Sequence, residues 1–80
     1  MHIELARTVA RAAFRSSREL GALVPMLKQQ LSADEFDIYS KAIATTIASI
    51  QIDIVNKLTA EHSGLEAEIE AAIKRDGHYS

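Results

Sequence analysis

The fold is decided by residues 32–61, SADEFDIYSKAIATTIASIQIDIVNKLTAE, a stretch without glycine or proline. It opens on a capping box, because the Ser32 hydroxyl can accept a hydrogen bond from the backbone N–H of Glu35 while the Glu35 carboxylate reaches back to that of Ser32. Large apolar residues then recur at intervals of three and four, the spacing of one helix face; they are Phe36, Tyr39, Ile43, Ile47, Ile50, Ile54 and Leu58. The stretch predicts one long amphipathic helix over residues 33–61.

The second half of this stretch allows another interpretation. A weaker apolar stripe lies beside the first and consists of Ala44, Ala48, Ile52 and Val55. Residues 50–54 alternate between apolar and polar side chains and are rich in β-branched residues, so a strand over residues 49–55 is the alternative. We favour the helix because the spacing of three and four continues from Phe36 to Leu58 with no turn residue between them.

Shorter helices are expected before the long one. Residues 3–20 show a helical period and are followed by Gly21, a common residue just past a helix end. Pro25 suits the first turn of a second helix over residues 24–31, where its missing N–H costs nothing. The alternative is a single helix over residues 3–31, kinked at Pro25.

A last helix is expected over residues 65–75. It carries acidic residues early and basic residues late, the order that the helix dipole favours. Residues 76–80 are expected to be a frayed tail. The chain is therefore predicted to form a single all-α domain over residues 1–80.

The long helix is expected to carry more apolar surface than its own chain can cover. At about 1.5 Å per residue it spans about 43 Å, whereas residues 3–20 reach only about 27 Å. The chain has 80 residues, few aromatics, and no cysteine that could staple a thin core. We predict a small helical bundle completed by homodimerisation, with the first stripe, Ile52 and Val55 as core or dimer interface. The alternative is a compact four-helix monomer whose last helix folds back over the second stripe.

Four arginines share the side of residues 3–20 opposite its apolar side; they are Arg7, Arg11, Arg15 and Arg18. Such a row can bind an anion or an acidic protein partner, or it can stay solvated and pair in part with acidic residues of the last helix, Glu66, Glu68 and Glu70. We favour the solvated, partly paired face, with an acidic protein partner as the next interpretation. Nucleic-acid binding is disfavoured because the net charge is −2 and no aromatic residue lies on that face.

Residues that could carry catalysis or bind a metal are scattered along the chain. Of the three histidines, His2, His62 and His78, only His62 has a possible second ligand at the spacing of a helical metal site, which is Glu66, and Gly64 is expected to break the helix between them. The sequence has neither a glycine-rich phosphate loop nor an arrangement of nucleophile and base. We therefore expect no catalytic residue, no metal and no cofactor.

The location and the role follow from the same observations. No uncharged stretch is long enough to span a membrane, and the start of the sequence lacks the apolar region of a signal peptide, so a cytoplasmic protein is expected. The sequence predicts a small, non-enzymatic interaction protein, such as a homo-oligomeric adaptor, a chaperone-like binder or a regulatory subunit. A nucleic-acid-binding regulator that uses the arginine row is the alternative.

Overall fold

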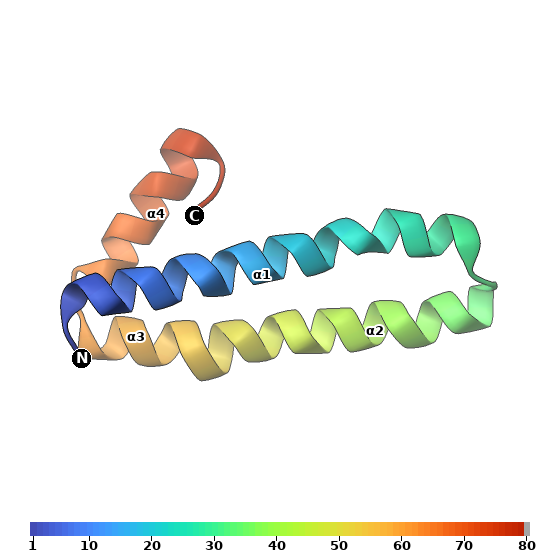
Figure 1. Ribbon diagram of the computed structural model, residues 1–80, viewed down its shortest axis with the longest axis horizontal. Coiled ribbons are helices and arrows are strands. Elements are labelled where there is room, and N and C mark those ends of the chain that lie inside the picture. Colours follow the sequence, from blue (N-terminus) through green and yellow to red (C-terminus); the bar gives the residue numbers. More distant parts are fainter. Residues whose placement is uncertain (80) are drawn as a thin grey trace.

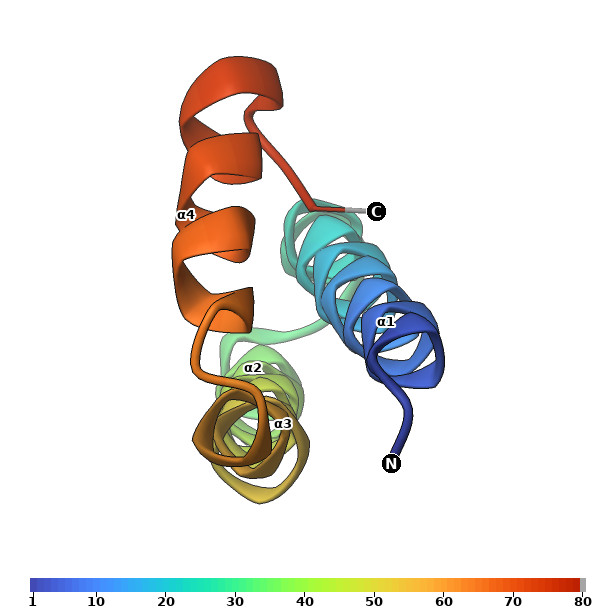
Figure 2. The same cartoon turned by 90° about the vertical axis from the view of Figure 1, so that its left-hand side faces the viewer.

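The computed structural model describes residues 1–79, and every regular element in that range is a helix. In chain order these are α1 (Ile3–Gln30), α2 (Ala33–Ser49), the π-helical η1 (Ile50–Val55), α3 (Asn56–Glu61) and α4 (Leu65–Asp76). The segments α2, η1 and α3 follow one another without a break as one rod antiparallel to α1, and we call α1 and the rod the helical hairpin (Figure 1). α4 lies on one side of this hairpin only (Figure 2). The predicted all-α fold is confirmed.

α1 is one continuous helix, which corrects the predicted break into helices over residues 3–20 and 24–31. Pro25 lies inside α1 with its ring exposed, so the helix loses one N–H donor there without a buried ring to accommodate. Gly21 does not end the helix; a Cβ there would lie 4.0 Å from the Ile47 Cδ1 atom of the rod. Because α1 packs along the rod, the helix continues through Pro25, and the single-helix alternative is the one observed.

The turn between α1 and α2 is short because both helix ends are capped. α1 ends where the N–H of Leu31 donates to the Leu27 carbonyl at 2.9 Å. α2 begins after Ser32, whose hydroxyl accepts from the Glu35 N–H at 3.2 Å. The Glu35 carboxylate accepts from the Ser32 hydroxyl at 3.1 Å, instead of from the backbone N–H that a full capping box would use. The predicted start of the long helix is therefore confirmed. Of the two hydrogen bonds of the predicted capping box, one is present and the other has a different donor.

The rod covers the predicted helix over residues 33–61, and the alternative strand over residues 49–55 is not found. Residues 50–55 instead form a π-helical turn, after which the Asn56 N–H donates to the Gln51 carbonyl five residues back. A π-turn holds more residues than an α-turn, so it acts like a one-residue insertion and rotates the helix that follows. Val55 is therefore buried, at 4% exposure, whereas Ile54 is 39% exposed. The inward-facing stripe continues from Ile50 through Val55 to Leu58.

The core lies at the end of the hairpin where α4 packs. Its residues come from α1, from the end of the rod, from α4 and from the segment after it: Ala6, Ala10, Ala13, Val55, Leu58, Leu65, Ile69, Ala72 and Tyr79. No residue from 14 to 54 is buried, so the other half of the hairpin is a layer of two helices. The last helix does fold back on the hairpin, but it does not cover the second stripe as the monomer alternative expected: of that stripe only Val55 is buried, while Ala44, Ala48 and Ile52 are exposed.

The segment after α4 also packs on the core, which corrects the predicted frayed tail over residues 76–80. Gly77 has a φ of 81° and its N–H donates to the Ile73 carbonyl at 2.8 Å, so α4 ends in a left-handed glycine cap. The cap reverses the chain and returns Tyr79 to α1, where its ring meets the Phe14 ring edge-on at 5.7 Å. Tyr79 is only 5% exposed. Ser80 lies outside the described residues.

Candidate functional site

The arginines of α1 form a common face, but they do not have equivalent surroundings. Arg7 donates from Nε to the Glu68 carboxylate at 3.0 and 3.2 Å, and from Nη1 to Glu4 at 2.7 Å. The hydrogen bond to Glu68 is the main reason that the pKa of Arg7 lies above its usual value. The predicted pairing with the last helix is therefore confirmed at Glu68, while Glu66 and Glu70 stay exposed.

The other arginines have looser surroundings. The Arg11 guanidinium lies over the Tyr79 ring, 5.7 Å from its centroid, which is within the range of a cation–π contact. Arg15 is exposed and takes part in none of the ion pairs found within residues 1–79. Arg18 is exposed on the same side. The positive charge that this face offers to a partner is thus smaller than the row of four implies.

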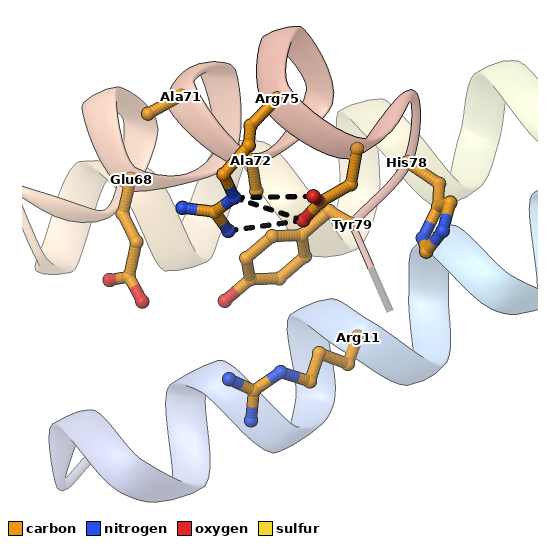
Figure 3. Close-up of a pocket in the computed structure, with 8 residues that line it drawn as sticks. Arg11, Glu68, Ala71, Ala72, Arg75, His78 and Tyr79 are labelled. Carbon is orange, nitrogen blue, oxygen red and sulfur yellow. Dashed lines mark hydrogen bonds and ion pairs between the residues drawn. The ribbon is translucent and has the colours of Figure 1, made fainter.

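A pocket of about 270 Å³ lies between α1 and α4 beside Tyr79 (Figure 3). Its lining residues are Arg11, Glu68, Ala71, Ala72, Arg75, Asp76, His78 and Tyr79. The Arg75 guanidinium is held by Asp76 at 3.1 Å, and the buried Tyr79 hydroxyl has no hydrogen-bond partner among the described residues. Acidic and basic side chains balance each other here, and no nucleophile stands beside a base, so the pocket has no recognisable chemistry.

The buried phenol of Tyr79 gives a testable pH dependence. Burial, assisted by the charge of Glu68, raises the pKa of Tyr79 above its ordinary value. The folded state then keeps this proton at a pH where the unfolded chain, ionising near 10, has lost it. Stability is therefore complete below the unfolded pKa and falls as the pH rises toward the folded pKa.

We expect Tyr79→Phe to lose this dependence. At pH 9 its free energy of unfolding should lie within about 1 kcal/mol of the wild-type value, because the hydroxyl it removes has no partner. At pH 11 the variant should be the more stable of the two. Urea unfolding of both proteins at the two pH values measures the difference between their free energies of unfolding. A difference that does not change with pH would contradict the buried position of the phenol.

The three histidines lie in three different segments of the chain. His2 caps α1 by accepting from the Glu4 N–H at 3.2 Å, His62 follows α3, and His78 lies in the segment after α4. Within residues 1–79, no three histidine or acidic side chains are gathered as a metal site requires. None of the helices in that range combines the length and the apolar character needed to cross a membrane.

An uncharged apolar surface lies on the side of the hairpin opposite α4. Its centre is a groove of about 210 Å³ between α1 and η1, lined by Val9, Ala12, Ala13, Ser16, Ile50 and Ile54. α4 packs against a different side of α1, where it meets Arg7 and borders Phe14. Figure 2 shows this second side of the hairpin without a covering helix.

A helix turns by about 100° per residue, so the other residues on the same side of α1 and of the rod can be read from the sequence. On α1 the same side carries Leu5, Leu20, Leu23 and Leu27, and on the rod it carries Tyr39, Ile43 and Thr46. We call these residues, together with those lining the groove, the open face. None of them is charged, and the large side chains remain accessible: Leu5 is 53% exposed, Leu23 41%, Tyr39 54% and Ile54 39%.

The stripe residues of the predicted long helix therefore have different surroundings. Val55 and Leu58 belong to the core, and Tyr39 and Ile54 are exposed members of the open face. The side chains that are half-buried between α1 and the rod are Phe36, Ile43, Ile47 and Ile50. Ile52 is 61% exposed on the outside of the rod.

Sequence reasoning missed the contribution of α1 to this surface. Its apolar and small residues run at intervals of four and three, at positions 5, 9, 12, 16, 20, 23 and 27. That pattern was a usable signal, but the expected break at Gly21 divided it. Comparison of the chain with protein-family models, with curated proteins and with solved structures gives no match.

Proposed function

We propose that this chain is a small interaction protein that works as a homodimer of helical hairpins and has no catalytic activity of its own. The excess surface of the single chain carries the proposal. It exposes 5527 Å², whereas a compact monomer of 8.8 kDa should expose about 4,800 Å². Its radius of gyration is 14.7 Å, against about 11.6 Å for a compact chain of this length.

The distribution of burial supports the same proposal. α2 has no buried residue, although it carries Phe36, Ile43 and Ile47. Two helices can cover only one side of each other, so an amphipathic layer of this kind needs a further layer to complete a core. A second copy supplies that layer without any other component, as in the common two-fold assemblies of soluble proteins.

The direct test is the mass in solution as a function of concentration. Sedimentation equilibrium should give twice the chain mass of 8.8 kDa, with dissociation on dilution. Because a dimer is stabilised by mass action, the thermal midpoint should rise with protein concentration. A single-chain mass at the highest soluble concentration, with a concentration-independent midpoint, would contradict the proposal.

The arginine face is the best candidate for contact with an acidic protein partner. The arginine face lies on the side of α1 away from the open face. A dimer formed through the open face would therefore leave Arg15 accessible. Arg7 and Arg11 already contact Glu68 and Tyr79 within the chain. Nucleic-acid binding usually requires a larger excess of positive charge than this face carries.

A further inference from the structure

We infer that the open face is the surface through which two copies of this chain meet, so that two hairpins stack into a four-helix bundle with both α4 helices outside. The inference rests on the proposed dimer and adds the surface that forms it. Of the two sides of the hairpin, one is already partly covered by α4 (Figure 2). The other is the open face, with a groove at its centre and exposed Leu and Tyr side chains around it.

The area available fits a second copy. The chain exposes roughly 700 Å² more than a compact monomer of its mass. A standard stable interface removes about 800 Å² from each partner. The molecule is 45 Å long, and the open face follows α1 from Leu5 to Leu27, so a second hairpin has room to bury an area of this size.

The chemistry of the face also suits self-association. A two-fold interface brings the same patch of both copies together, so a charged patch would meet its own charge. The open face has no charged residue, and the intervals of three and four on α1 are those by which packed helices interdigitate. The exposed residues near the face carry both signs, with Glu19 on α1 and Asp53 and Lys57 on the rod. Repulsion between these residues of two copies is therefore small.

The test compares two leucine-like positions of equal exposure. Leu23 on the open face and Ile73 on α4 are both 41% exposed in the single chain, so Leu23→Glu and Ile73→Glu should disturb the isolated fold to a similar extent. Desolvating the new carboxylate at the interface should weaken dimerisation by at least about tenfold for Leu23→Glu. Ile73→Glu should dimerise like the wild type, as measured by sedimentation equilibrium.

A second measurement does not depend on the folding of the glutamate variants. The chain has no cysteine, so Ser16→Cys in the groove and Ala71→Cys on the exposed side of α4 each introduce one thiol. The thiol at position 16 should react with a disulfide reagent at least about tenfold more slowly at a concentration where the chain is dimeric than where it is monomeric, because packed interfaces exclude water. The thiol at position 71 should react equally fast at both concentrations.

The outcomes separate the two proposals. A dimer that survives Leu23→Glu, with the thiol at position 16 reactive at all concentrations, overturns the assignment of the face and leaves the dimer standing. A chain that remains monomeric overturns both proposals and leaves the open face for a different protein. Loss of the dimer in Ile73→Glu alone would place the interface on α4 and would also overturn the assignment.

Discussion

Leu65→Ala should lower the free energy of unfolding by about 2–5 kcal/mol, the range for a buried leucine truncated in a close-packed core. Leu65 is the first residue of α4, and at 1% exposure it is the large side chain that is most completely buried. It lies where α3 ends and α4 turns back toward α1, so the cavity would open in the core that these elements share.

This loss would be a large part of the total stability. A domain of 80 residues is expected to have about 4–12 kcal/mol in all. The matched control is Ile52→Ala, which removes an aliphatic side chain that is 61% exposed on the rod and should change stability by no more than about 0.5 kcal/mol. Urea unfolding followed by circular dichroism, at one fixed protein concentration, measures both. Similar losses for the two variants would show that the core is not where α4 packs.

Deleting Ile52 should leave the fold intact, with a change in unfolding free energy of less than about 1 kcal/mol. The π-helical turn over residues 50–55 holds one residue more than an α-helix needs. Without Ile52, Ile50 and Val55 become separated by four positions, so a regular α-helix keeps both on the inward side. The deleted side chain itself is mostly exposed and contributes little to the core.

The same deletion in a regular helix should have a much larger effect. Ala22 is exposed in the α-helical part of α1. Its removal would rotate the following residues by about 100° and move the half-buried side chains of Val24 and Leu27 out of their present positions, at a cost of about 2 kcal/mol or more. Urea unfolding and helix content compare the two deletions. Equal destabilisation by the two deletions would mean that the π-helical turn is not a simple one-residue insertion.

Local sequence signals predicted the helical elements well where a short-range cause was present. The cap at Ser32 and Glu35 depends on side chains three residues apart, and the structure has it. The last helix, expected over residues 65–75 from its charge order, is found over Leu65–Asp76, and that charge order is also a local signal. The predictions failed where packing between distant segments overrides such signals, as at Gly21 and Pro25, which would end a free helix but remain helical against the rod.

The surfaces of the molecule were less predictable than its helices. The pattern of three and four placed Ile54 in the inward stripe, but one π-turn exchanged it with Val55. Such a turn depends on how the rod packs against the other helices. No local sequence motif predicts it. The pairing of Arg7 with Glu68 was foreseeable from opposite charges on two helices, whereas the stacking of Arg11 on Tyr79 required the chain reversal at Gly77.

The amino-acid sequence by itself determined that this protein is all-helical and that its long helix begins after Ser32, because capping, spacing and charge order act within a few residues. It also indicated more apolar surface than one small chain can bury. Only the tertiary structure decided where that surface lies: α4 covers one side of the hairpin near Leu65, and the open face remains on the other. The reason is physical, since burial depends on which helices meet, and that choice is made by the summed packing of residues far apart in the chain.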